Sequence, residues 1–254
     1  METIGLIAAM TQESSALLQF VPRREKVSLK RFSAARFQLT NRACLLATSG
    51  IGIERATDCA RSLVASAHPQ LLISFGIAGA VNANLDIGDV VVSTGNCAWE
   101  SGAPTPLHPL AALSKQAWDA AAHDLQPERV QLVTGIAITT RGSQVIPDAA
   151  ASLTNPILEM ETAGIARVAA ESGTPFLSIR SISDGPRAPI PIDLEAVMDE
   201  QYDLRIGKLL GMVVRHPRLF GKLPPMMQNS AKAARCCAVA VFAVLNQPSA
   251  IISV

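Results

Sequence analysis

Short runs of β-branched residues alternate along this chain with longer amphipathic stretches, and this alternation limits the folds open to it more than any other feature. The short apolar runs predict buried strands, and apolar residues that recur every three to four positions predict helices. We expect strands over residues 4–9, 43–48, 70–75, 89–94, 130–140 and 175–181, and helices over 11–20, 53–67, 110–124 and 161–172. This order predicts an α/β fold with three layers, α/β/α, around a central mixed, largely parallel sheet.

The composition fits such a fold. With 254 residues, 49% of them hydrophobic, the chain can bury a full core without disulfides or a metal. The five cysteines form no CxxC pair and the four histidines lack ligand spacing, so we expect no metal site and no cofactor. No signal peptide is recognisable, and the apolar run 236–245 is shorter than the roughly 20 residues of a spanning helix. We therefore expect a cytoplasmic protein.

Charge is distributed unevenly along the chain. The net charge of +1 argues against a nucleic-acid partner. Residues 204–254, however, contain seven lysines and arginines and no acid, which leaves a net charge of −6 on residues 1–203. We predict a core domain over 1–203 and a basic, apolar helical extension over 204–254. Three surroundings fit this tail: an anionic surface, solvent alone, or the acidic body of a neighbouring subunit.

Four chemically distinctive loops, at 10–13, 49–52, 76–79 and 183–184, follow expected strands. Ligands of α/β folds bind at the carboxyl ends of strands. The two glycines of Gly76–Gly79 would let the backbone approach a ligand, although the same sequence also suits a tight turn. The chain lacks a Walker loop, a GxGxxG fingerprint at this position and the Gly-x-Ser-x-Gly motif of serine hydrolases.

Three carboxylates lie at informative positions. Glu13 follows the first expected strand, Glu161 opens an expected helix, and Asp184 follows the apolar stretch 176–182. Next to a buried strand a carboxyl group is shielded from water, so its pKa can rise and it can act as a general acid. A second carboxylate that stays ionised can act as a base or bind hydroxyls. Taken singly, a carboxylate at such a position is more often a helix cap or a solvated group.

Five segments, in order along residues 4–185, resemble the methylthioadenosine/S-adenosylhomocysteine nucleosidases of the wider nucleoside phosphorylase/nucleosidase superfamily. They are Ile4–Met10 with Glu13, Ser49–Gly52, Ser74–Ala80 with Leu85–Ser93, Glu159–Glu161, and Arg180–Asp184. The resemblance implies a catalytic domain over 1–203 that cleaves the N-glycosidic bond of a 5′-substituted adenosine and releases adenine. It also implies a homodimer or higher oligomer in which a neighbour closes the pocket.

The resemblance implies a role for each matching residue. Asp184 would protonate N7 of the purine, Glu13 would position and deprotonate the attacking water, and Glu161 would accept the ribose hydroxyls. The other implied contacts are to the ribose through Met160 and Met10, to the base side through Ser183, Arg180, Glu159, Ala78 and Gly79, and to substrate, phosphate or water through Ser49, Gly50, Ile51, Gly76 and Ile77.

Departures from the family pattern bear on the reaction. Ile77 stands where the nucleosidases have a serine, and no arginine stands near Ser74, where related phosphorylases hold phosphate. Together with Glu13, the missing arginine favours hydrolysis over phosphorolysis. The segment Arg141–Ile146 matches the nucleosidases poorly, which leaves the base specificity open.

The region after Asp184 resembles the hopanoid-associated phosphorylases in its prolines and its basic appended segment. That resemblance implies adenosylhopane, a lipid-linked nucleoside, as the favoured substrate. Basic residues near an anionic bilayer gain about 1 kcal/mol each, so 204–254 would contact the inner membrane surface peripherally. The run 236–245 would then bury in the membrane interface or line a lipid tunnel. Alternatively, this run packs on the domain or on a partner subunit.

Three other interpretations stay open. The chain could be a methylthioadenosine/S-adenosylhomocysteine nucleosidase without a lipid substrate, or a true phosphorylase that uses phosphate. It could also be a nucleoside-binding module that has lost turnover. The presence of all three carboxylates argues against the last interpretation, because a pure binder needs no proton donor.

Overall fold

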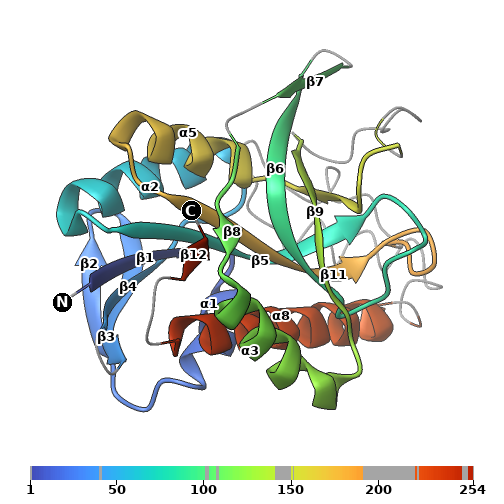
Figure 1. Ribbon diagram of the computed structural model, residues 1–254, viewed down its shortest axis with the longest axis horizontal. Helices are drawn as coiled ribbons and strands as arrows, with labels where there is room; N and C mark the ends of the chain where they lie inside the picture. Colours follow the sequence, from blue (N-terminus) through green and yellow to red (C-terminus); the bar gives the residue numbers. More distant parts are fainter. Residues whose placement is uncertain are drawn as a thin grey trace.

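The computed structural model describes residues 2–39, 42–100, 103–106, 109–140, 150, 152–190, 221, 223–247 and 251–253. A central mixed sheet carries helices on both faces, so the predicted three-layer α/β/α fold is confirmed (Figure 1). The strands are β1 (Glu2–Ala8), β2 (Glu25–Leu29), β3 (Phe32–Leu39), β4 (Arg42–Thr48), β5 (Leu71–Ala80), β6 (Val90–Glu100), β7 (Ala103–Pro106), β8 (Ala112–Leu113), β9 (Leu132–Thr139), β10 (Pro156–Glu159), β11 (Phe176–Asp184) and β12 (Ile252–Ser253). The helices are α1 (Thr11–Leu18), α2 (Ile53–Ala67), α3 (Lys115–Leu125), η1 (Gln126–Glu128, a 3-10 turn), α5 (Thr162–Ser172) and α8 (Leu223–Leu245).

The order of the strands in the main sheet is β10-β9-β6-β11-β5-β1-β4-β3-β2, with β7 paired to β6. Strands β4, β1, β5 and β11 run parallel to one another, whereas β6 is antiparallel to β11. Strand β10 pairs with β9 and also with β5. The pairings β5-β11-β6-β9-β10-β5 therefore close into a ring, which gives this half of the sheet an enclosed interior.

Two apolar layers cover the two faces of the sheet. Along β1, Ile4 and Leu6 pack with α1, α3 and α8, whereas Ile7 packs with α2 and α5. This is the alternation expected of a strand that is buried on both faces. In Figure 1 the pair α2 and α5 lies above the sheet, and α1, α3 and α8 lie below it.

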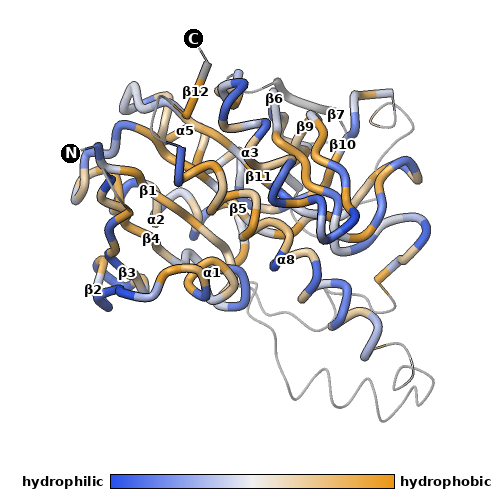
Figure 2. Tube along the Cα trace, turned by 60° about the horizontal axis from the view of Figure 1, so that its bottom comes forward, coloured by the Kyte–Doolittle hydropathy of each residue, from blue (hydrophilic) through white to orange (hydrophobic). Residues whose placement is uncertain are grey.

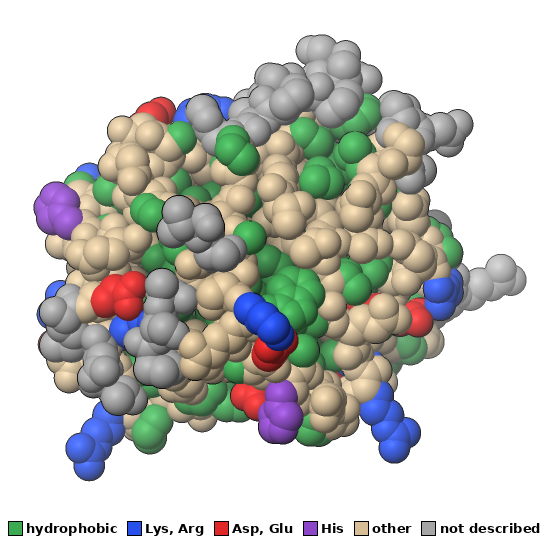
Figure 3. Space-filling model, in the orientation of Figure 1, with side chains coloured by type: hydrophobic (Ala, Val, Ile, Leu, Met, Phe, Trp, Pro, Cys, Tyr) green, Lys and Arg blue, Asp and Glu red, His purple; other side chains and the backbone are tan. Residues whose placement is uncertain are grey.

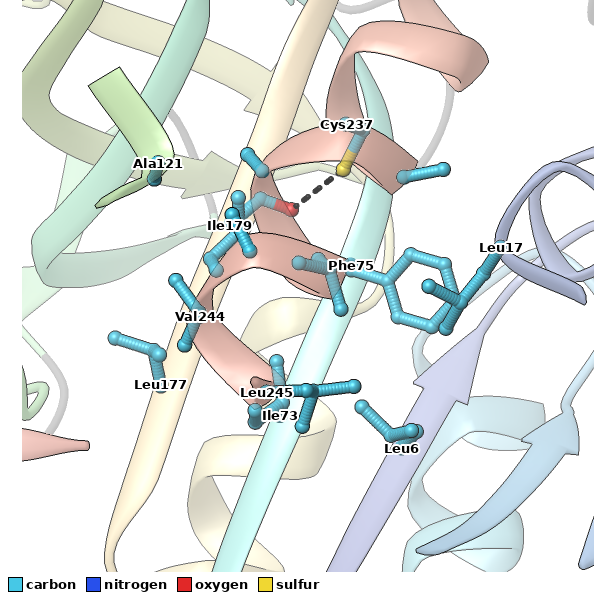
Figure 4. Packing of buried hydrophobic residues seen from close by; sticks show 14 of the residues in the cluster. Leu6, Leu17, Ile73, Phe75, Ala121, Leu177, Ile179, Cys237, Val244 and Leu245 are labelled. Carbon is cyan, nitrogen blue, oxygen red and sulfur yellow. Dashed lines mark hydrogen bonds between the residues drawn. The ribbon is translucent and has the colours of Figure 1, made fainter. Parts of the chain in front are cut away.

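The C-terminal helix α8 is part of the core. Its residues from Ala233 onward lie against β11 and β5, and Figure 4 shows Cys237, Val244 and Leu245 among the side chains of these strands. Figure 2 shows the helix changing from hydrophilic in its first turns to hydrophobic toward its end. The run 236–245 therefore packs on its own domain, and its interpretation as a segment buried in the membrane interface is wrong.

The boundary predicted at residue 203 lies outside the described residues, and the division into two parts stays a prediction. Within the described ranges, no helix combines the length and the apolar character needed to cross a membrane.

Several elements differ from their expected bounds. Strand β5 does not end at Phe75 but continues through Gly76–Gly79 to Ala80, because β11 pairs with it along this length. The segment predicted as a glycine loop is therefore strand. Helix α3 begins only at Lys115, where the Ser114 hydroxyl accepts a hydrogen bond from the Ala117 amide at 3.2 Å. The hairpin β2–β3 and the short strand β10 were not among the expected strands.

Candidate active site

Glu13 lies in the first turn of α1, directly after β1, and its side chain is buried. One carboxylate oxygen accepts a hydrogen bond from the Ile77 amide at 2.9 Å, and the other accepts one from the Met10 amide at 2.8 Å. The carboxylate occupies the space that a side chain on Gly76 would fill. Burial raises the pKa of Glu13, although the backbone hydrogen bonds and the Arg180 charge oppose this shift.

A polar network fills the ring interior beside this carboxylate. The buried Arg180 guanidinium donates to the Ser74 hydroxyl at 2.7 Å, to Glu159 at 3.1 Å and to the Thr162 hydroxyl at 3.2 Å. Glu159 also accepts hydrogen bonds from the Thr139 hydroxyl and from the Thr162 amide, the latter at 2.7 Å. Because a buried ion pair needs such additional hydrogen bonds, this network holds the Arg180 charge in place.

Glu161 stands at the N-terminus of α5, where one carboxylate oxygen accepts a hydrogen bond from the Gly52 amide at 2.9 Å. Gly52 has a φ of +102° and Gly50 a φ of +84°, so both positions of the loop 49–52 require glycine. Burial and the nearby charge of Glu159 raise the pKa of Glu161 to about 8, against the opposing charge of Arg180. The group therefore changes its protonation state close to neutral pH.

Asp184 ends β11, after an irregularity in the pairing with β5 that follows Ile182. The Ser183 hydroxyl donates to its carboxylate at 2.6 Å. The other carboxylate oxygen lies against Gly79, only 2.7 Å from where a Cβ would stand. Burial raises the pKa of Asp184, and the hydrogen bond from Ser183 partly offsets this. A half-buried acid of this kind can hold a proton for delivery to a ligand.

The three carboxylates gather at one end of the β5–β11 pair. Glu13 lies against Gly76 of β5, and Asp184 lies against Gly79, three residues nearer the carboxyl end of the same strand. Glu161 interacts electrostatically with both Arg180 and Glu13.

Two cavities open onto this region. The larger, about 740 Å³, is lined by Ser49–Gly52, Thr140 and Met160, together with side chains from β3 and the start of α2. The smaller, about 340 Å³, is lined by Ser183 and Asp184, the segment 188–190 and the first turns of α8. Both volumes fall within the range of small-molecule sites.

The sequence-predicted residues fall into three groups. Ser49, Gly50, Ile51 and Met160 line the larger cavity, whereas Ser183 and Asp184 line the smaller. A second set surrounds the two glycines of β5 and comprises Met10, Glu13, Gly76, Ile77, Ala78 and Gly79. Glu159 and Arg180, expected on the base side, lie in the interior network, where Glu159 also accepts a hydrogen bond from the Glu161 amide at 3.0 Å. Glu13, Glu159, Glu161 and Arg180 line neither cavity. The segment Arg141–Ile146 lies outside the described residues.

Sequence reasoning missed the hydroxyl groups of this network. Ser74, Thr139 and Thr162 come from three different elements and meet only through the register of the sheet. The spacing of these residues in the chain carries no signal of that meeting. The asparagine Asn229, which lines the smaller cavity from α8, was also not anticipated.

A three-layer fold with buried carboxyl groups of raised pKa at one end of a strand pair is the arrangement that the resemblance to nucleosidases and nucleoside phosphorylases implies. Comparison with protein families agrees with this: the model described as Phosphorylase superfamily matches residues 3–207, and the chain belongs to that superfamily.

The chain is also similar to curated relatives in sequence and to solved structures in fold. The 5′-methylthioadenosine/S-adenosylhomocysteine nucleosidase of Glaesserella parasuis is 28% identical over 200 residues, which cover 71% of this chain and 85% of the relative. That of Bacillus licheniformis is 29% identical over 223 residues, covering 79% and 95%. The nucleosidase of Neisseria meningitidis in complex with methylthio-immucillin-A superposes with a TM-score of 0.70 at 22% identity, covering 97% of this chain and 99% of that one. A futalosine hydrolase mutant of Helicobacter pylori has a TM-score of 0.68 at 18% identity, covering 97% and 99%.

Proposed function

We propose that this protein hydrolyses the N-glycosidic bond of a 5′-substituted adenosine and releases adenine. The observation that carries the proposal is the gathering of Glu13, Glu161 and Asp184 at one end of the β5–β11 pair, each with a pKa raised by burial. Carboxyl groups in different environments can divide acid, base and electrostatic roles among them.

Asp184 acts as the general acid. A purine is a poor leaving group as an anion, and protonation at N7 lets it leave as neutral adenine. Burial raises the pKa of Asp184, which favours its protonated form, and the Ser183 hydroxyl fixes the orientation of the carboxyl group. The electron pair of the bond between C1′ and N9 passes to the purine as the proton is delivered. Such proton transfer contributes typically about 10²–10⁴-fold in rate.

Glu161 and Glu13 act on the sugar side. With Met160 and Met10, Glu161 binds the ribose, and its ionised form stabilises the positive charge that develops on the sugar. Glu13 positions a water molecule against C1′ and takes its proton as the new bond between carbon and oxygen forms. Amides of Ile77 and Met10 hold the Glu13 carboxylate for this task.

Hydrolysis is favoured over phosphorolysis by the charges near Gly76. The Glu13 carboxylate fills the space at this glycine and would repel a phosphate anion there. The nearby cation, Arg180, is already hydrogen-bonded to Glu159, Ser74 and Thr162. A phosphate would have to displace these partners to gain the charge of the guanidinium.

The 5′ substituent extends from the ribose at Met160 into the larger cavity. The relatives favour methylthioadenosine or S-adenosylhomocysteine as the substrate. Adenosylhopane rests on the sequence resemblance of the C-terminal region alone. Polar and charged side chains in the cavity wall, among them Arg31, Ser33, Arg55 and Asp58, suit a short or polar substituent better than a long hydrocarbon.

A substrate panel tests the proposal. We expect free adenine to be released from 5′-methylthioadenosine and S-adenosylhomocysteine at the same rate with and without inorganic phosphate. An adenosine with a long alkyl group at the 5′ position serves as the lipid-linked probe. Adenine release that requires phosphate would make the protein a phosphorylase. Release from the alkyl probe alone would support the lipid-linked substrate instead.

The oligomeric state stays part of the proposal. A homodimer or higher oligomer would cover the open larger cavity with a neighbouring subunit. Light scattering coupled to size-exclusion chromatography tests this, and a monomer with full activity would contradict it.

A further inference from the structure

The smaller cavity contains a polar side chain that the proposed mechanism does not use. Its walls are formed by Asp184 and Ser183 on one side, by the apolar residues 188–190 on a second, and by Met226 and Asn229 of α8 on a third. A cavity with apolar walls and a few polar groups suits a heteroaromatic ring. At about 340 Å³ the cavity also has room for a purine base.

Asn229 occupies a distinctive position on α8. Along the same side of the helix, at spacings of three or four residues, Asn229 is followed by Ala233, Cys237, Ala240 and Val244. These four side chains are buried in the core. One turn before that apolar stripe, Asn229 presents an amide to the cavity that contains Asp184. Asparagine lowers helix propensity, so this choice is not explained by the stability of α8. Within the described ranges, the amide has no hydrogen-bond partner.

The chemistry of the amide complements adenine. The carbonyl oxygen of an asparagine accepts a hydrogen bond, and its amino group donates one. Adenine offers the complementary pair at neighbouring positions, a donor at the N6 amine and an acceptor at a ring nitrogen, and asparagine is a common partner for this base. With Asp184 at N7, the next edge of the ring would face Asn229.

We propose that Asn229 is a specificity-determining residue that recognises the 6-amino edge of the purine. Its carbonyl oxygen accepts a hydrogen bond from the N6 amine, and its amino group donates to N1. The proposal rests on the proposed function, because that function places a purine at Asp184. It assigns to α8, whose later turns pack in the core, a direct contact with the substrate.

The proposal is tested by removing the Asn229 side chain and the 6-amino group of the substrate, each alone and both together. The rate constant kcat/KM for 5′-methylthioadenosine is compared with that for the analogue that has hydrogen in place of the 6-amino group, in the wild type and in Asn229→Ala. We expect the wild type to prefer the amino compound by about 10-fold, the value of one hydrogen bond. In Asn229→Ala the preference falls to about 2-fold or less, since both substrates then lack the contact.

The control is Gln228→Ala, which removes a neighbouring, exposed amide that does not line the cavity. This variant keeps the wild-type preference. Alanine is a better helix former than asparagine, so Asn229→Ala retains α8. An unchanged preference in Asn229→Ala, or no preference in the wild type, overturns the proposal.

Binding of the free bases separates this inference from the proposed function. Equilibrium dialysis measures the binding of adenine and of unsubstituted purine to the wild type and to Asn229→Ala, which makes the same comparison without turnover. If the wild type cleaves no nucleoside but Asn229→Ala abolishes its preference for adenine over purine, the proposed hydrolysis fails and the base-recognition role stands. If turnover proceeds and both comparisons show no dependence on Asn229, only the role of Asn229 fails.

Discussion

Two glycines of β5 decide where the proposed catalytic acids lie. Glu13 occupies the side-chain space of Gly76, and Asp184 that of Gly79. A strand with ordinary side chains at these positions would push both carboxyl groups away from the sheet. The same closeness removes water from the acids, and this desolvation is the largest cause of their raised pKa values.

Replacing Asp184 by asparagine removes the proton donor and little else. Asparagine keeps the size of the side chain and can still accept the hydrogen bond from Ser183. We expect kcat for adenine release to fall by at least about 10²-fold with an unchanged melting temperature. The exposed Asp86 provides a matched control, because Asp86→Asn removes only a surface ion pair with Arg187. Near-normal turnover of Asp184→Asn would rule out its role as the acid.

At this scale the sequence predicts part of the site. Motif matching singled out Glu13, Glu161 and Asp184 as candidates, because each directly follows a buried strand or begins a helix. It could not predict that Glu159 binds Arg180 inside the ring, since that contact depends on how β10 and β11 are placed across β5. Side chains on separate strands become neighbours through sheet register, which local sequence patterns do not encode.

Among the elements, α8 depends on one buried side chain at its C-terminus. The Arg42 guanidinium of β4 donates to the carbonyl oxygen of Leu245 at 2.8 Å and to that of Gln247. It also forms an ion pair with Glu2 at 2.7 Å. Carbonyl groups at a helix C-terminus lack partners within the helix, and a cation there satisfies them and complements the helix dipole. Arg42 thus anchors α8 to the edge of β4.

We expect Arg42→Met to destabilise the protein without a direct effect on the site. Methionine retains the apolar length of the side chain but leaves the carbonyl groups of Leu245 and Gln247 without their donor. The expected loss is about 2–3 kcal/mol, or roughly 4–12 °C in melting temperature for a chain of this size. The exposed ion pair of Lys115 with Asp119 gives the control, and Lys115→Met should cost less than about 1 kcal/mol. Equal effects of the two variants in thermal unfolding would contradict the anchoring role.

The elements themselves were predictable where the pattern was long. The helix expected over 53–67 coincides with α2, because its apolar stripe is continuous and its start and end carry clear signals. The hairpin β2–β3 was missed because charged and exposed residues interrupt its alternation, as at Glu25 and Arg36. Strand β10 has only four residues and is held by partners on both sides, so its strand character comes from tertiary pairing.

For the molecule as a whole, the basic C-terminal region raises the question of membrane contact. Among the residues that the structure describes, Met227 is the only large hydrophobic side chain that is exposed, and the apolar part of α8 is internal. Figure 3 shows basic and acidic side chains scattered over the face in view. Of the seven basic residues after 203, the described part of the chain includes Lys232 and Arg235, and Arg235 pairs with Glu128 at 2.8 Å.

We therefore expect any membrane contact to be electrostatic and weak. Sedimentation with neutral phosphatidylcholine vesicles should recover no bound protein. Binding to vesicles that contain phosphatidylserine should disappear as salt approaches about 0.5 M, where charge interactions are screened within a few ångströms. Binding that persists in high salt, or to neutral vesicles, would indicate apolar insertion and restore the lipid-facing interpretation.

Whole-molecule stability should carry the signature of the buried site. Each of the three carboxyl groups has a folded-state pKa above its unfolded value, so the native state binds more protons than the unfolded state between those values. Stability from this source is fully present below the unfolded pKa of about 4.5 and is lost as pH rises through the folded pKa. For Glu161 the pH range over which this stability is lost extends to about pH 8. At the neutral pH where the site would work, much of this stability is already lost, a cost often found at active sites.

Glu161→Gln isolates this effect, because glutamine keeps an acceptor for the Gly52 amide but cannot ionise. We expect this variant to lose activity by about 10²-fold or more and to gain stability over the wild type as pH rises from 5 to 8. The gap grows by at most about 1.4 kcal/mol per pH unit and levels off above pH 8. Urea unfolding at a series of pH values measures it, with Glu25→Gln, an exposed carboxylate, as the control that should follow the wild-type curve. Parallel curves for Glu161→Gln and the wild type would mean that Glu161 is ionised at no cost in the folded protein, and its proposed titration near neutral pH would be wrong.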